Sequence, residues 1–188
     1  MSAHDDERAL LMPSLRTDRV IEDPKVIEEI LNRVPVGHLG LSWKNRPYVV
    51  PLLFAAMDGS IYLHCSDSGM MMEFLRNNSS VCFEVEEFLD IVPGLVPCKY
   101  TNTYRSVIAF GTAQILTDPD EKTAGLHLIV AKYAGEEVAR TLTKDMVEEY
   151  RSMLLHRSTV VFKIRIDQIT GKRFEPEKTN VSTAASRG

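Results

Sequence analysis

Residues 61–78, IYLHCSDSGMMMEFLRNN, carry the side chains best suited to chemistry. The segment has the pattern of a β-strand that ends in a short polar loop and is followed by a helix. The first backbone N–H groups of a helix have no internal partners, so such a junction can hold a phosphate. Ser66 and Ser68 add hydroxyl groups, but Met70 and Met71 stand where a phosphate site usually supplies Lys or Arg. The junction therefore predicts an anion site that lacks its cation.

His64 stands at the end of the same predicted strand. An imidazole can both donate and accept a proton near neutral pH, which makes this residue a candidate for supplying a proton to a substrate. The alternative is a strand-end histidine that only bonds a backbone carbonyl. Ser66 and Ser68 can likewise be ordinary turn residues, and the three consecutive methionines can pack against the body of the protein.

Composition excludes several classes of partner. The chain has 188 residues, and its 22 basic against 26 acidic side chains give a net charge of −4, which offers no general attraction for nucleic acid or an anionic membrane. The first sixteen residues do not form a signal peptide, and no apolar run is long enough to span a bilayer. Cys65, Cys82 and Cys98 form no C-x-x-C pair, so neither a disulfide framework nor a metal site is expected. These features predict a cytoplasmic protein.

The elements that must position the junction are mostly short strands. Helices are predicted at 24–33, 69–77, 119–134 and 144–155, with Asp23, Asp118 and Thr143 as the N-terminal caps of the first, third and fourth. Strands are predicted in VGHLGLSW, PYVVPLLFAA, SIYLHC, VCFEVEEF, YRSVIAFGTAQIL and STVVFKIRIDQITGKRF, with residues 89–103 as a long loop. Gly111 is expected to mark a bulge or bend in its strand.

This order predicts a mainly β protein with helical decoration, built as a six-stranded antiparallel barrel. Residues 14–175 form the expected domain. Residues 1–13 are an N-terminal extension, and residues 176–188, which have no apolar period, are expected to be a disordered tail.

Four segments in this order resemble a known family. They are LRTDRVIEDPKVIEEILNRVPVGHLGLS, RPYVVPLLFAAMDGSIYLHC, SGMMMEFLRNNSSVCFEV and YRSVIAFGTAQILTDPDEK. Their succession resembles the FMN-binding split-barrel family related to pyridoxamine 5'-phosphate oxidase, in particular its nitroimidazole-resistance (Nim) type. The resemblance covers residues 14–174 and implies a split β-barrel that binds FMN.

The resemblance also implies roles for particular positions. The backbone of one strand would face the polar edge of the flavin ring, at Val50, Pro51, Leu52, Leu53 and Phe54. Leu63 and His64 would reach the ribityl chain and phosphate, beside the loop that holds Ser66, Ser68, Met70 and Met71. Ser106 would approach the flavin from a neighbouring strand, and Arg105 either lies on the strand surface or reaches the phosphate in place of the missing basic pair. Cofactor sites in this family lie at a dimer interface, so a homodimer is implied.

Two functional classes follow from this resemblance. The first is an FMN-dependent oxidoreductase that acts on a small acceptor, such as a nitroaromatic or quinone-like compound, with His64 as the proton donor. The second is a non-catalytic flavin- or haem-binding split barrel with a degenerate site. Pyridoxamine phosphate oxidase activity itself is not expected, because GKRFEPEKTN does not match the arginine-rich substrate segment of that enzyme.

Overall fold

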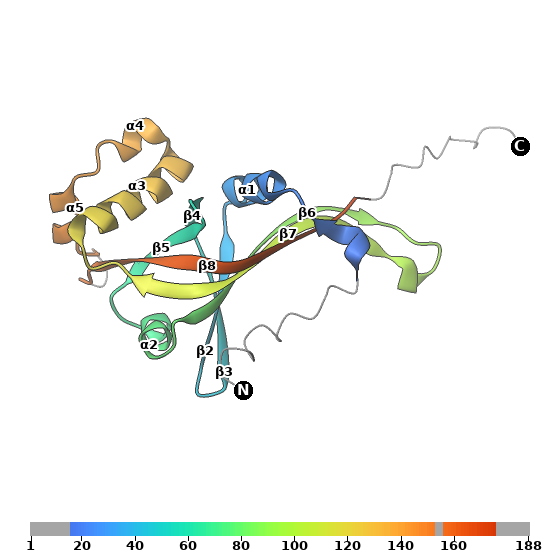
Figure 1. Ribbon diagram of the computed structural model, residues 1–188, viewed down its shortest axis with the longest axis horizontal. Helices are drawn as coiled ribbons and strands as arrows, with labels where there is room; N and C mark the ends of the chain where they lie inside the picture. The colour runs from blue at the N-terminus through green and yellow to red at the C-terminus, as the bar shows by residue number, and fades with distance from the viewer. Residues whose placement is uncertain (1–15, 153–155, 176–188) are drawn as a thin grey trace, which may run out of the picture.

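A computed structural model describes residues 16–152 and 156–175. The predicted extension at 1–13 and the predicted tail at 176–188 lie outside the described residues. Within them the model has eight strands and five α-helices, with single 3₁₀ turns at Thr17–Arg19 and Pro97–Lys99. Figure 1 labels the helices and all the strands except β1.

Three helices begin at the positions that their capping residues predict. α1 (Pro24–Arg33) starts after Asp23, whose Oδ1 accepts the Lys25 N–H at 2.9 Å. α3 (Pro119–Ala134) starts after Asp118, and α5 (Lys144–Glu149) after Thr143, whose hydroxyl accepts the Met146 N–H. Each cap satisfies an N–H group that the helix itself leaves unpaired, so these starts are confirmed.

The strands form one antiparallel sheet. They are β1 (Val20–Ile21), β2 (Gly37–Trp43), β3 (Arg46–Leu52), β4 (Phe54–Met57), β5 (Ser60–Ser66), β6 (Ser80–Val92), β7 (Thr101–Ile115) and β8 (Thr159–Phe174). Their order across the sheet is β3-β2-β6-β7-β8-β5-β4, and β1 pairs with β8. β6 and β7 make a long hairpin that projects away from the helices (Figure 1).

One residue closes the sheet into a barrel. β3 and β4 lie at the two ends of the strand order, yet only Leu53 separates them in the chain. The two ends must therefore lie next to each other, and the sheet curls around a core that includes Leu39, Phe54, Phe83 and Phe162. The rings of Phe54 and Phe83 meet edge to face, with centroids 4.9 Å apart. The predicted split-barrel fold class is confirmed.

Several predicted details are wrong. The described chain has eight strands instead of six, because PYVVPLLFAA breaks at Leu53 and a two-residue strand precedes α1. The predicted loop at 89–103 is only residues 93–100, since β6 continues through Val92 and β7 begins at Thr101. The fourth predicted helix stops at Glu149, and α4 (Glu136–Ala139) was not predicted. The irregularity predicted at Gly111 is present as a register shift between Phe110 and Gly111, but the extra residue, Asp167, lies in β8 and not in the strand of Gly111.

The helices cover different parts of the barrel. α3, α4 and α5 lie together near β5 and the first half of β8, and α2 (Met70–Asn77) lies on the opposite side of the sheet (Figure 1). Met72, Phe74 and Leu75 of α2 are buried against the barrel, while Met71 is only partly buried. The three methionines that were expected to pack therefore differ: Met72 is buried, Met71 packs partly against the core and Met70 is exposed.

Candidate functional site

β5 places His64 on the face of the sheet that α3 and α5 cover. Ile61 and Leu63 point into the core, so the alternation of a strand sends Tyr62, His64 and Ser66 to the other face. There His64 lines a cavity of about 610 Å³ whose other walls are mostly apolar. They are Leu126 and Val130 of α3, Leu142, then Met146, Val147, Glu149 and Tyr150 of α5 and its end, and Thr159 of β8.

Burial lowers the pKa of His64 below its ordinary value of 6.5. The imidazole is therefore neutral near pH 7, with one nitrogen that donates a hydrogen bond and one that accepts. A neutral imidazole at the wall of an apolar cavity can position a ligand, or exchange a proton with it, without bringing a permanent charge.

A second, polar cavity adjoins the first. It has a volume of about 250 Å³ and is lined by His64, Cys65, Ser66, Tyr150, Ser152, Arg157, Ser158 and Thr159. The Oγ atom of Ser66 is buried and has no hydrogen-bond partner within the described residues. A buried hydroxyl without a partner carries an energetic cost, so this atom favours a bound polar group.

The loop between β5 and α2 is held in place by hydrogen bonds. The Asp67 N–H donates to Ser158 O at 3.1 Å, and the Ser158 N–H donates to the Asp67 carboxylate at 3.3 Å. Arg76 donates to the Asp67 carbonyl oxygen from the last turn of α2. Gly69 has φ +103°, a backbone conformation that glycine adopts without strain, and it turns the chain into the helix.

The first turn of α2 leaves backbone donors free. Glu73 is the first residue whose N–H bonds within the helix, to Gly69 O at 3.1 Å. Ser68 and Met70 are exposed, whereas Met71 packs partly against the core. The N–H groups of this turn could therefore reach an anion, but the turn has no Lys or Arg beside them.

β3 offers an open edge to a ligand. Val50, Pro51 and Leu52 pair with β2 on one side, and no described strand pairs with β3 on the other. Leu53 is 46% exposed. Phe54 is fully buried in the core, and its side chain cannot contact a ligand directly. Backbone groups on the open edge of β3 are thus available, as the assignment to the flavin ring requires, whereas the N–H and C=O of Phe54 are already bonded to the Tyr133 hydroxyl.

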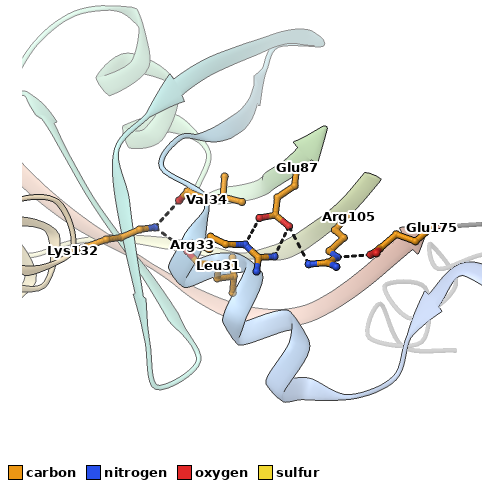
Figure 2. Close-up of polar contacts among 7 residues, drawn as sticks. All are labelled: Leu31, Arg33, Val34, Glu87, Arg105, Lys132 and Glu175. Carbon is orange, nitrogen blue, oxygen red and sulfur yellow. Dashed lines mark hydrogen bonds and ion pairs between the residues drawn. The ribbon is translucent and has the colours of Figure 1, made fainter. Parts of the chain in front are cut away.

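Arg105 and Ser106 lie far from His64 within one chain. His64 pairs with Val161 of β8, whereas Ser106 pairs with Lys172 of the same strand. The eleven positions between these partners correspond to about 35 Å of extended strand. Arg105 is also engaged by carboxylates, because it contacts Glu175 at 2.5 Å and Glu87 at 3.9 Å, and Arg33 binds Glu87 as well (Figure 2). The predicted site residues therefore fall into two separate groups in the protomer.

Two residues that the sequence analysis did not select hold the barrel closure in place. Tyr133 places its hydroxyl 3.0 Å from Phe54 N, 2.9 Å from Phe54 O and 2.6 Å from Pro35 O. The neighbouring Lys132 donates to Leu31 O and Val34 O, both at 2.8 Å, at the end of α1 (Figure 2). Burial lowers the pKa of Lys132 to about 8. Neither side chain has a local sequence signal, because its partners are about 80 to 100 positions away.

Other chemical groups do not form a site. In residues 16–152 and 156–175, no cluster of three His, Cys, Asp or Glu side chains could hold a metal ion. The same part of the chain contains no helix with the length and apolar character that crossing a bilayer requires. Burial raises the pKa of the Cys65 thiol to about 12, and also raises that of Cys82, so neither is a thiolate near neutral pH.

Comparison with known proteins places this fold. A candidate 5-nitroimidazole antibiotic resistance protein from Bacteroides thetaiotaomicron is 30% identical, with a TM-score of 0.62 over 82% of this chain and 86% of that one. An FAD-binding protein from Mesorhizobium loti is 25% identical, with a TM-score of 0.54 over 84% and 98%. An FAD- and haem-binding protein from Mycobacterium smegmatis shares the fold, with a TM-score of 0.70 at 18% identity over 84% and 74%.

No curated protein has a significantly similar sequence. The family model described as pyridoxamine 5'-phosphate oxidase matches residues 23–173, which is most of the chain. The resemblance read from the four sequence segments is thereby confirmed, and the chain belongs to the pyridoxamine 5'-phosphate oxidase family.

Proposed function

We propose that this protein binds FMN and is an oxidoreductase that passes electrons to a small acceptor beside His64. The main support is the end of β5, where a neutral histidine lines a cavity and the free N–H groups of α2 follow within a few residues. Relatives that are 25% and 30% identical to this chain are described as an FAD-binding protein and a candidate nitroimidazole resistance protein. Together these observations favour a flavin site over an unloaded barrel.

The residues present fit a flavin phosphate, although they would hold it weakly. The free N–H groups of α2 and the exposed Ser68 hydroxyl beside them are the donors that the phosphate would use. The open edge of β3 near Val50 and Leu52 would accept the polar edge of the ring. Because these donors are few and uncharged, one phosphate suits the site better than the two of FAD.

The chemistry divides between cofactor and chain. A bound flavin supplies electron transfer, so the protein has to orient the ring and select what approaches it. His64 would hold the acceptor and exchange a proton with it, because its neutral imidazole has both a donor and an acceptor nitrogen. The helices α3 and α5 line the apolar side of the same cavity, where the ring of an acceptor would displace water.

We also propose that the working form is a cytoplasmic homodimer. Arg105 and Ser106 can join the group around His64 only if a second copy supplies them, since about 35 Å of strand separates the two groups in one chain. The projecting β6–β7 hairpin carries exposed apolar residues that a second copy would cover. They are Phe88, Leu89, Ile91, Leu95, Val96 and Tyr100.

Flavin binding is tested by titration of the flavin-free protein with FMN and, in parallel, with FAD, followed by flavin fluorescence. We expect saturation with FMN at lower concentration than with FAD. No binding of either flavin at hundreds of micromolar would refute the proposal. A haem spectrum in the purified protein would instead support the alternative, a non-catalytic haem-binding barrel.

The role of His64 is tested by His64→Ala and His64→Asn in stopped-flow oxidation of the reduced protein by nitroaromatic and quinone acceptors. A proton donor predicts that both variants keep FMN and lose about a hundredfold or more in rate. Recovery of the rate in His64→Asn would show that the histidine acts only through hydrogen bonding and donates no proton.

The shared site is tested by mixing two inactive variants, His64→Ala and Ser106→Trp. If each site combines β5 of one protomer with β7 of its partner, random exchange restores about one quarter of the sites. Absence of any recovery, with exchange confirmed by mass, would exclude a shared site.

A further inference from the structure

The two cavities beside His64 adjoin each other. His64, Tyr150 and Thr159 line both of them, and we call the two together the cleft, with an apolar end of about 610 Å³ and a polar end of about 250 Å³. Leu126 and Val130 of α3 face Met146 and Val147 of α5 at the apolar end. An apolar space of this volume can hold an aromatic ring system and suits it better than a polar chain.

The charges around the cleft are unevenly placed. Arg157 lines the polar end and has no ion pair within the described residues. Glu149 is exposed and lines only the apolar end. Asp67 lines neither cavity; its Oδ2 accepts the Ser158 N–H, and its Oδ1 is buried without a hydrogen-bond partner within the described residues. Arg157, which is itself exposed, is therefore the permanently charged residue that lines the polar cavity.

Hydrogen-bond donors converge on the same end. The Ser66 Oγ is buried without a partner, and its hydroxyl can donate to an oxygen placed in the cavity. Arg157 can present two parallel N–H groups, which match the two oxygens of a carboxylate. His64 lines both ends, so it can contact a ligand at the position where an apolar ring is joined to a polar group.

We propose that this cleft binds aromatic carboxylates, with the rings between α3 and α5 and the carboxylate at Arg157 and Ser66. This proposal names aromatic carboxylates as the class of acceptor for the proposed oxidoreductase. The role of the cleft in catalysis therefore rests on the proposed function. Binding in the cleft requires no flavin, so it can be measured separately.

The test is calorimetric titration of the flavin-free full-length protein with naphthoate and with naphthamide, its uncharged analogue. We expect naphthoate to bind more tightly. Arg157→Gln should weaken naphthoate about tenfold and leave naphthamide nearly unchanged, since one charge-assisted hydrogen bond is lost. Ser66→Ala should weaken naphthoate by a smaller factor. Arg46→Gln, at an exposed arginine on β3, is the matched control and should change neither ligand.

Three results would contradict the proposal that the cleft binds aromatic carboxylates. Equal affinity for the two ligands, no binding up to about 10 mM, or an unchanged naphthoate affinity in folded Arg157→Gln would overturn it. Val130→Trp fills the apolar end and should abolish binding of both ligands; continued binding would place them elsewhere. FMN titration of the same samples separates the two proposals. FMN binding without naphthoate binding refutes only this inference, and the reverse refutes only the proposed flavin site.

Discussion

The hydroxyl of Tyr133 ties α3 to the point where the barrel closes, so its removal should have a measurable cost. It accepts the Phe54 N–H at 3.0 Å and has one proton to donate, to either Pro35 O at 2.6 Å or Phe54 O at 2.9 Å. Phe54 is fully buried. Tyr133→Phe therefore leaves a buried N–H without a partner.

An unsatisfied buried donor costs about 1–3 kcal/mol. We expect Tyr133→Phe to lower the free energy of unfolding by that amount, and the melting temperature by about 2–4 °C for each kcal/mol. Urea denaturation of flavin-free protein measures it, followed by the fluorescence of Trp43, which packs on Phe74 of α2 with ring centroids 6.0 Å apart. Protein concentration must be held constant, because dimerisation would add to the measured stability.

Tyr150→Phe is the matched control. This side chain is 54% exposed and lies outside the β6–β7 hairpin, so loss of its hydroxyl should change the stability of the ligand-free protein by less than about 0.5 kcal/mol. A change equally small in Tyr133→Phe would show that the Phe54 N–H does not depend on the hydroxyl. The Tyr133 hydroxyl would then not stabilise the closure of the barrel at Phe54.

Three further changes test the site and the sheet. Met71→Lys should tighten FMN binding about ten- to a hundredfold in a fluorescence titration, because it restores a cation at α2; an effect no larger than that of Met57→Lys would place the phosphate elsewhere. The folded-state pKa of His64 is lowered, so its contribution to stability is present above about pH 6.5 and is lost as the pH falls through the folded pKa. Urea midpoints from about pH 7.5 to 5 should therefore fall more in wild type than in His64→Asn, and parallel curves would contradict the burial of this imidazole. Gly111→Ala should lower the free energy of unfolding by about 2 kcal/mol or more, because a Cβ there would lie 2.2 Å from Arg165 O; a wild-type urea midpoint would show that the strands can separate at no cost.

Features that depend on a few neighbouring residues could be predicted from the sequence. Asp23, Asp118 and Thr143 cap the helices that follow them, because a cap bonds N–H groups only two or three positions away. The alternation of β5 likewise places His64 and Leu63 on opposite faces, whatever packs against them. The junction at residues 61–78 was therefore recognisable as a strand, a loop and a helix before its surroundings were known.

Partners distant in the chain were decided only by the tertiary structure. The break at Leu53 has no turn signal, and it follows from the need to join the two ends of the strand order. Arg105 was assigned as either a surface residue or a phosphate ligand, but the register of β6, β7 and β8 places it beside Glu87 and Glu175.

The cleft and the separation of the two groups of site residues have the same origin. Arg157 lines the same cavity as Ser66 because β5 pairs with β8, and Ser106 is distant from His64 because it pairs eleven positions further along β8. Period and composition determine which face of a strand a side chain occupies. Which strand lies opposite, and at which register, depends on long-range pairing that no local pattern encodes.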